Sequence, residues 1–353
     1  MQGVVFLGER KTELREFPDP TPGPRDVILE IKASGMCGTD LKAYRGKFVP
    51  GEIRGGIKRS DEPVIAGHEP CGVVAAVGSA VSEREARIGQ RVMDHHYQGC
   101  GVCRHCNSGW TQMCLDGAVV FGSVGHGAHA NYMRVPASTL VPLPDELSFQ
   151  TGAAISCGTG TAYGALSRLT LRGEETIAIF GQGPVGLAAT QLAVAMGARV
   201  IALDISSERR QLAEGLGADV TIDPKVGDPV AMIHELTHGL GAHKSLDCSS
   251  AAEARAQAVR STRAWGSCCY VGEGGEVRLD VSGDLIRRQI TLMGSWTFST
   301  VGQSDCAQFI ADRRIDVDAL FSDRWNLNEA EEAYRLFDQQ VTGKGVILPN
   351  GDA

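Results

Sequence analysis

The stretch from residue 176 to residue 204 constrains the fold more than any other part of the chain. It reads TIAIFGQGPVGLAATQLAVAMGARVIALD: an apolar strand, a glycine-rich turn, an apolar helix and a second apolar strand that ends at Asp204. Continuous apolar strands are typical of a parallel sheet covered on both faces. The alternation continues, with helices predicted at 206–217 and 251–263 and strands at 219–223, 244–249, 266–272 and 290–296. We therefore predict an α/β fold built on a doubly wound parallel sheet.

The glycines of this stretch have the spacing of a dinucleotide-binding turn. Gly181 permits the tight turn, Gly183 lets the backbone approach a pyrophosphate, and Gly186 lets the helix pack closely on the strand. Pro184 and Val185 open the helix, whose first N–H groups would face the phosphates. An isolated GxGxxG is common, but this one follows a strand, opens a helix and precedes an acid at the end of the next strand. That context predicts a dinucleotide site.

Asp204 bears on which nicotinamide dinucleotide is bound. Its carboxylate can accept hydrogen bonds from the adenosine ribose hydroxyls and would repel a 2′-phosphate, which favours NAD(H) over NADP(H). Arg209 and Arg210 follow closely, and an arginine nearby could instead receive such a phosphate. NAD is the predicted cofactor, with NADP as the less favoured alternative.

A cluster of four cysteines lies in CGVCRHCNSGWTQMC, residues 100–114, where either disulfides or a metal ion could use them. The chain lacks a signal-peptide pattern and any run of about 18 apolar residues, so we expect a cytoplasmic protein whose thiols stay reduced. Zn²⁺ prefers four thiolates at tetrahedral corners. Cys100, Cys103, Cys106 and Cys114 are therefore predicted to hold a structural zinc, because a full thiolate shell leaves no position for chemistry.

Size and charge limit the remaining possibilities. A chain of 353 residues exceeds what one core usually serves, so about two domains are expected. The net charge of −8 argues against nucleic acid or an anionic membrane surface as the main partner.

A second group of metal-ligand residues is scattered over the first half. It comprises Cys37 in GMCGTDLK, His68 and Glu69 in AGHEPCG, and Cys157 in ISCGTGTAYGA. Each has a simple alternative explanation, as a buried thiol or a core histidine with satisfied hydrogen bonds. Together they form a Cys₂His set that leaves a fourth zinc position open to water or substrate.

These motifs occur in a recognisable order. CGTD is followed by GHE, the four-cysteine cluster, GAHANYMRVPA, CGTGTAYGAL, the glycine turn with its acid, LGAD and GKGVILP. Over nearly its whole length the chain resembles the zinc-dependent medium-chain dehydrogenase/reductase superfamily, near the alcohol, polyol and threonine dehydrogenases. The resemblance implies a β-rich, GroES-like catalytic domain at 1–157, an NAD-binding Rossmann domain at 158–297, and a segment at 298–353 that returns to the catalytic domain. It also implies a homodimer or homotetramer.

The resemblance implies roles for the scattered residues and two zinc ions per chain. Cys37, His68 and Cys157 match the ligands of a catalytic zinc. Glu69 matches a carboxylate beside the metal, which binds it transiently in some members. Asp40 matches the group that orients the ligand histidine and raises its basicity.

The expected proton relay departs from the family pattern. Thr39 matches the hydroxyl that passes the substrate proton outward. Many members carry a histidine five residues after the first ligand, where this chain has Lys42. An ammonium cannot accept a proton unless its pKa is depressed. The relay could end in solvent, Lys42 could steady the cofactor ribose or an anionic substrate, or it could be an exposed lysine.

Two residues bear on the substrate. His96, four positions before the cysteine cluster, matches a place that often walls the substrate pocket, and a polar wall favours a polyol or sugar derivative. Trp296 is a candidate for an apolar pocket or interface residue.

We predict an oxidoreductase that uses zinc to transfer hydride between NAD and an alcohol, which is expected to be a secondary alcohol, a polyol or a sugar derivative. Its expected partners are small alcohols or carbonyl compounds. The alternatives are a zinc-free quinone or enone reductase on the same scaffold and a non-catalytic protein that binds NAD and zinc.

Overall fold

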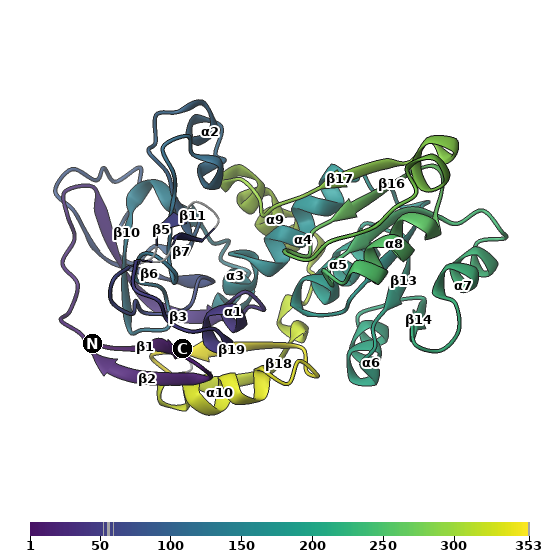
Figure 1. Ribbon diagram of the computed structural model, residues 1–353. Coiled ribbons are helices and arrows are strands. Elements are labelled where there is room, and N and C mark those ends of the chain that lie inside the picture. Colours follow the sequence, from purple (N-terminus) through teal and green to yellow (C-terminus); the bar gives the residue numbers. More distant parts are fainter. Residues whose placement is uncertain (52, 55–56, 59, 352–353) are drawn as a thin grey trace. The chain divides into compact units, whose positions relative to one another are not determined.

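A computed structural model describes residues 1–51, 53–54, 57–58 and 60–351 (Figure 1). The chain forms two compact units. The first unit comprises Met1–Gly160, Phe298–Gln340 and Lys344–Ala353, and the second comprises Thr161–Thr297 and Val341–Gly343. The domain boundaries were predicted after residues 157 and 297. In the structure the chain passes from the first unit to the second after residue 160 and returns to the first after residue 297. Val341–Gly343, expected in the catalytic domain, groups with the second unit, where the Thr342 carbonyl accepts a hydrogen bond from Arg209.

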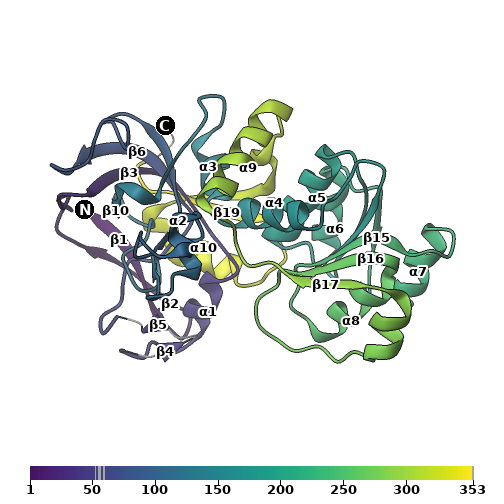
Figure 2. The same cartoon turned by 90° about the horizontal axis from the view of Figure 1, so that it is seen from above.

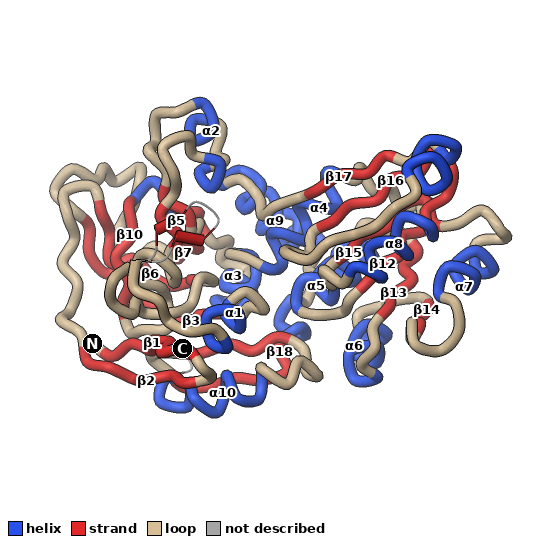
Figure 3. Tube along the Cα trace, viewed as in Figure 1, coloured by secondary structure: helices blue, strands red, loops and turns tan. Residues whose placement is uncertain are grey.

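The second unit confirms the predicted doubly wound sheet. Six parallel strands lie in the order β14-β13-β12-β15-β16-β17 (Figure 3). Their bounds are β12 Thr176–Phe180, β13 Arg199–Leu203, β14 Val220–Ile222, β15 Ala242–Asp247, β16 Thr262–Tyr270 and β17 Thr291–Gly294. The order runs outward from β12 to β14 and then, on the other side, from β15 to β17. In such sheets ligands bind at the carboxyl ends of the strands, at the point where the order reverses.

Helices cover both faces of this sheet, which is why its central strand is buried along its whole length. Every residue of β12 is buried. Helices α5 and α6 lie on one face and α8 on the other (Figure 2). The helices of this part of the chain are α4 Gly158–Arg168, which crosses the unit boundary, α5 Pro184–Ala195, α6 Ser207–Gly215, α7 Pro229–Leu236 and α8 Ala252–Ser261. Strand β16 begins four residues before the predicted 266, with an irregular stretch around Trp265, whose φ is 65°.

The first unit is built on a mainly antiparallel sheet. Six strands follow the order β11-β7-β6-β3-β19-β18, and β10 also pairs with β3. Their bounds are β3 Asp26–Gly35, β6 Pro70–Val77, β7 Arg91–Asp94, β10 Tyr132–Pro136, β11 Leu140–Pro142, β18 Phe321–Asn326 and β19 Lys344–Leu348. Smaller pairs are β1 Gln2–Gly8 with β2 Lys11–Glu16, β4 Ile53–Arg54 with β5 Ile57–Lys58, and β8 Tyr97–Gln98 with β9 Val119–Val120. The helices are α1 Asp40–Arg45, α2 Arg104–Asn107, α3 Phe149–Ile155, α9 Thr300–Arg313 and α10 Ala330–Phe337.

Strand pairing in this sheet brings distant segments to one place. Strand β3 runs antiparallel to β6, with Ser34 opposite Pro70, and antiparallel to β19, with Gly35 opposite Val346. The carboxyl end of β3 therefore meets the amino ends of β6 and β19. Cys37 follows β3, His68 and Glu69 precede β6, and Lys344 begins β19.

Helix α10 closes the first unit beneath this convergence. Its buried side chains, Ala330, Ala333, Tyr334 and Phe337, recur at helical spacing and form one apolar face. They pack with Phe6, Met36 and Leu41 in one hydrophobic cluster. Among the residues that the structure describes, no helix combines the length and apolar character needed to cross a membrane.

Candidate active site

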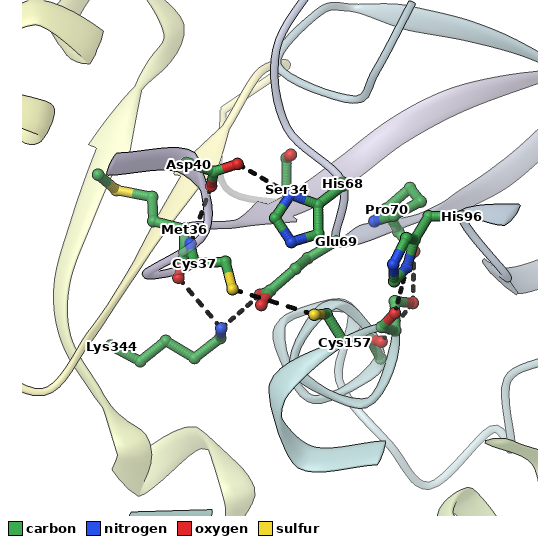
Figure 4. Close-up of polar contacts among 12 residues, drawn as sticks. Ser34, Met36, Cys37, Asp40, His68, Glu69, Pro70, His96, Cys157 and Lys344 are labelled. Atoms are coloured by element: carbon green, nitrogen blue, oxygen red, sulfur yellow. Dashed lines mark hydrogen bonds and ion pairs between the residues drawn. The ribbon is translucent and has the colours of Figure 1, made fainter. Parts of the chain in front are cut away.

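The structure brings together the four scattered residues of the predicted catalytic metal site (Figure 4). One ligand atom from each of Cys37, His68, Glu69 and Cys157 lies within 4.8 Å of all the others. The two sulfur atoms are 4.0 Å apart. Two thiols, an imidazole and a carboxylate are donors that zinc accepts in a tetrahedral shell. Among the described residues, none forms a hydrogen bond with Oε1 of Glu69, although this atom is buried. The donor set fits a zinc ion.

A buried lysine holds the carboxylate of Glu69. Lys344 forms an ion pair with Oε2 of Glu69, and its ammonium also donates a hydrogen bond to the Met36 carbonyl at 3.2 Å. Burial alone would lower the pKa of Lys344, but attraction by Glu69 and Cys37 raises it, so the ammonium stays charged. Lys344 is the charged residue of the GKGVILP motif and begins a buried strand, a position that by sequence gives no sign of a role at this site.

Asp40 contacts two of the ligand residues. Its Oδ1 accepts a hydrogen bond from Nδ1 of His68 at 2.8 Å, and its Oδ2 accepts one from the backbone N–H of Cys37 at 2.9 Å. Burial alone would raise the pKa of Asp40, but the charge of His68 and the hydrogen bond from its Nδ1 lower this pKa to about 2. A carboxylate only accepts hydrogen bonds. Burial alone would lower the pKa of His68, but attraction by Asp40 and Cys37 raises it well above its usual range. If Nε2 binds a metal ion, the one remaining ring proton sits on Nδ1, where Asp40 accepts its hydrogen bond.

The two relay residues lie on the surface at the start of α1. Thr39 precedes the helix, is exposed, and its side chain makes no capping hydrogen bond. Lys42 follows within the first turn and is also exposed.

His96 lies beside the ligand cluster. Its ring centroid is 5.1 Å from that of His68, and its Nδ1 donates a hydrogen bond to the Ser156 carbonyl at 2.9 Å. Burial and the neighbouring His68 hold the pKa of His96 well below its usual range, so the ring is neutral. Because Nδ1 carries the proton, Nε2 is an acceptor. Trp296, by contrast, belongs to the second unit, where its side chain is 44% exposed.

The four cysteines of residues 100–114 also form one cluster. Their sulfur atoms lie within 4.8 Å of one another, and the sulfurs of Cys100 and Cys106 are 4.0 Å apart. All four are free thiols, so this cluster contains no disulfide. The turns around it depend on glycine, since Gly101 and Gly109 have φ angles of 75° and 80°. Four thiolates around one point fit a closed zinc shell.

The glycine turn of the second unit has the expected geometry. Gly181 has a φ of 88°, Gly183 caps α5, and Pro184 is its first residue. A side chain at Gly186 would overlap the carbonyl of Gly181, which explains the third glycine. Val185 follows in the first turn of the helix, whose amino-terminal N–H groups are free to meet an anion.

Asp204 is tied to this turn. Its Oδ2 accepts a hydrogen bond from the Gln182 N–H at 2.6 Å, and its Oδ1 accepts one from the Ser206 N–H at 2.8 Å. Arg210 donates to the Asp204 carbonyl at 2.8 Å and pairs with Asp223 at 3.2 Å. The Arg209 side chain reaches toward Gly183, and its Nε donates to the Thr342 carbonyl at 3.3 Å.

Comparison with known proteins identifies the family. Residues 23–145 match the alcohol dehydrogenase GroES-like domain, and residues 184–312 match the zinc-binding dehydrogenase domain. The uncharacterized zinc-type alcohol dehydrogenase-like protein YphC of Escherichia coli K12 is 37% identical over 355 aligned positions, covering 98% of each chain. The chain belongs to the zinc-dependent medium-chain dehydrogenases. The predicted family and fold class are thereby confirmed.

Solved structures of this dehydrogenase family agree with the fold of the chain. Alcohol dehydrogenase TADH from Thermus sp. ATN1 is 27% identical, with a TM-score of 0.88 and coverage of 99% of each chain. A putative zinc-binding dehydrogenase from Sinorhizobium meliloti 1021, bound to NADP, is 28% identical, with a TM-score of 0.85 and coverage of 99% of each chain.

Family membership confirms the predicted enzyme class: an alcohol dehydrogenase that uses zinc and a nicotinamide cofactor and acts on small alcohols or carbonyl compounds. The zinc-type alcohol dehydrogenases among the chain's relatives favour this class over the zinc-free quinone or enone reductase.

Proposed function

We propose that this dehydrogenase oxidises a secondary alcohol that carries a neighbouring hydroxyl, as in a polyol or sugar derivative, with NAD as hydride acceptor. The observation that carries the proposal is the ligand cluster of Cys37, His68 and Cys157, next to a neutral His96 whose Nε2 can accept a hydrogen bond. The carbonyl compound and NADH are the substrates of the reverse direction.

The catalytic zinc is assigned to Cys37, His68 and Cys157, with Glu69 beside it, and a second, structural zinc to the four-cysteine cluster. Held by these residues, a zinc ion would supply Lewis-acid chemistry that polarises a substrate oxygen and lowers the pKa of its hydroxyl. Asp40 keeps the His68 ring oriented and its proton on Nδ1. Lys344 holds one oxygen of Glu69, which keeps the carboxylate next to the site.

The exposed hydroxyl of Thr39 is assigned to proton transfer. No capping hydrogen bond engages it, so it can accept the substrate proton and pass it outward. Because Lys42 is exposed in the first turn of α1 and an ammonium has no lone pair, we assign the end of the relay to solvent rather than to Lys42.

NAD is proposed as the cofactor because of how the charges near Asp204 are arranged. Both of its carboxylate oxygens face backbone N–H groups of the turn region, and Arg210 is engaged by Asp223. The carboxylate of Asp204 would repel a 2′-phosphate, and of the two nearby arginines only Arg209 could attract it. NADP is therefore disfavoured. The proposed cofactor contacts are the turn residues Gly181, Gly183, Pro184, Val185 and Gly186, with Asp204 and Arg209.

Replacing Asp204 by asparagine tests this cofactor preference. Since a hydrogen bond to a charged group contributes about 1.5–3 kcal/mol, KM for NAD is expected to rise about 10- to 100-fold while KM for NADP stays level or falls. Asp219→Asn is the matched control, because Asp219 also accepts a backbone N–H bond, from Val200 at 2.9 Å, but stands at the amino end of β14, whereas Asp204 follows the carboxyl end of β13. An unchanged NAD-to-NADP ratio in Asp204→Asn would contradict the assignment.

A matched pair of alcohols tests the substrate class. 2,3-Butanediol and 2-butanol share one carbon skeleton and differ in a single hydroxyl, and NADH absorbance reports the oxidation of each. We expect the diol to be preferred in the wild type, and His96→Phe to lower kcat/KM for the diol about 10-fold with little change for 2-butanol, the size of one hydrogen bond. Metal analysis of the same sample should give two zinc ions per chain. A preference for the plain alcohol would overturn the substrate assignment.

The predicted homodimer or homotetramer remains a proposal. The edge strand β17 bears the exposed side chain of Leu292, and Trp296 follows it, which suits pairing with a second copy. A sedimentation mass of one chain would exclude it.

A further inference from the structure

A chain of buried hydrogen bonds leads away from the proposed zinc ligand His68 on the side opposite the metal. His68 donates a hydrogen bond to Oδ1 of Asp40, and the hydroxyl of Tyr334 donates one to Oδ2 of Asp40 at 3.1 Å. The Tyr334 oxygen lies 2.6 Å from Nε2 of His129, whose Nδ1 lies 2.7 Å from the hydroxyl of Ser34. All five residues are buried. We propose that Tyr334 and His129 are positioning residues for His68, acting through Asp40; this rests on the proposed function.

The donors and acceptors of this chain allow one arrangement. The carboxylate of Asp40 only accepts hydrogen bonds, so the hydroxyl of Tyr334 must be the donor in the bond between them. The Tyr334 oxygen then accepts from Nε2–H of His129, and Nδ1 of His129 accepts from Ser34. Burial lowers the pKa of His129 to about 4, which agrees with a neutral ring carrying one proton. The alternating order keeps Asp40 charged and its Oδ1 directed at the Nδ1 proton of His68.

His129 also supports the backbone immediately before His68. Gly67 has a φ of 86°, and a Cβ added there would lie 2.5 Å from Nδ1 and 2.7 Å from Cγ of the His129 ring. The N–H of Ala128 donates to the Gly67 carbonyl at 2.8 Å, and the N–H of His129 donates to the Ala66 carbonyl at 2.9 Å. The imidazole of His129 therefore packs flush against the peptide that carries the ligand.

Tyr334 reaches the site from α10. Its ring lies in the hydrophobic cluster beneath the sheet, edge-on to Phe6 at 4.7 Å and 82°, so only the hydroxyl is polar. A phenylalanine would fill the same space without burying a polar group, and burying unpaired polar groups is unfavourable. The hydroxyl is thus explained by its bond to Asp40. Neither Tyr334 nor His129 belongs to the ligand cluster, so neither is assigned a chemical step.

Tyr334→Phe, which removes only the hydroxyl, tests the proposal. The holoenzyme is treated with a chelator, and the release of zinc and the visible spectrum of the cobalt(II)-substituted enzyme are recorded with thermal unfolding. Mutation of a residue that hydrogen-bonds to a metal-ligating histidine typically lowers metal affinity 10- to 100-fold. In Tyr334→Phe we therefore expect one of the two zinc ions to bind about 10-fold more weakly and the cobalt bands to shift. Tyr44→Phe is the control: Tyr44 is buried in the same cluster, 5.6 Å from Tyr334, and takes no part in the chain of hydrogen bonds.

His129→Phe and the double variant give a second test. Residues that act through one network are not additive, so the double variant should lose no more metal affinity than the more affected single variant. If Tyr334→Phe does not fold, His129→Phe alone is compared with Tyr44→Phe. The proposal is overturned if Tyr334→Phe and His129→Phe release zinc at the same rate as Tyr44→Phe and show the same cobalt spectrum. It is also overturned if the losses of metal affinity in the two single variants simply add in the double variant, or if only the melting temperature falls. A wild type that holds a single zinc ion would instead refute the proposed function, and this inference with it.

Discussion

Replacement of Cys157 by alanine is expected to remove one of two zinc ions per chain and to stop alcohol oxidation. Cys157 supplies one of two sulfurs in the cluster with Cys37, His68 and Glu69, and its loss leaves a single thiolate, a much weaker donor set for zinc. Since the metal contributes several kcal/mol to stabilising charge in the transition state, the rate should fall by about three orders of magnitude or more. Metal analysis and NADH formation measure the two effects.

The matched control for this experiment is Cys306→Ala. Cys306 is also buried in the first unit, where its thiol faces the Thr159 carbonyl, but it lies outside the ligand cluster. This variant should keep both zinc ions and normal turnover. NAD affinity should survive in Cys157→Ala, because the glycine turn and Asp204 belong to the second unit. Retention of two zinc ions with a rate within tenfold of the wild type would contradict the assignment of the site.

Replacement of Cys106 by serine is expected to release the other zinc ion and to destabilise the protein. The segment around it has little regular structure beyond the four-residue α2 and a 3₁₀ turn at Thr111–Met113. It also has little apolar core, since Val102 is 76% exposed and Leu115 is 67% exposed. A metal ion bound by the four cysteines would supply the order that such a segment lacks by itself.

Disorder in the cysteine-cluster lobe, residues 100–114, is expected to disturb the start of α9. Gly109 accepts a hydrogen bond from the N–H of Thr300 at 3.0 Å, and Gln112 donates one to the Phe298 carbonyl at 2.8 Å. We expect the melting temperature to fall by about 10 °C, the effect of losing roughly 3–5 kcal/mol in a unit of this size. His105→Ala, inside the same lobe but not a ligand, is the control and should melt within about 2 °C of the wild type. An equal, small shift in both variants would argue against a zinc ion at these cysteines.

Local patterns in the chain were sufficient for the sheet of the second unit, the glycine turn and the cysteine cluster. Gly181, Gly183 and Gly186 act within one turn and one helix, and the four cysteines lie within fifteen residues, so short-range geometry brings their atoms together. The predicted strands and helices of this unit are found, because apolar runs and glycine stops decide them locally. The early start of β16 was not predictable, since the irregular stretch at Trp265 arises from its pairing with β15.

The surroundings of the catalytic ligands depended on long-range pairing instead. Lys344 lies 308 positions from Met36 in the chain, and Tyr334 lies 294 positions from Asp40. In the sequence Lys344 is a single charged residue before an apolar strand, and Tyr334 is one aromatic residue of an amphipathic helix. Neither pattern reveals the distant partner.

The sequence alone determined which residues are candidates for binding zinc and a dinucleotide, because that candidacy depends on side-chain chemistry and short spacings. Only the tertiary structure decided which buried polar groups support His68 and Glu69, since the register of β3 against β6 and β19 and the docking of α10 select each partner.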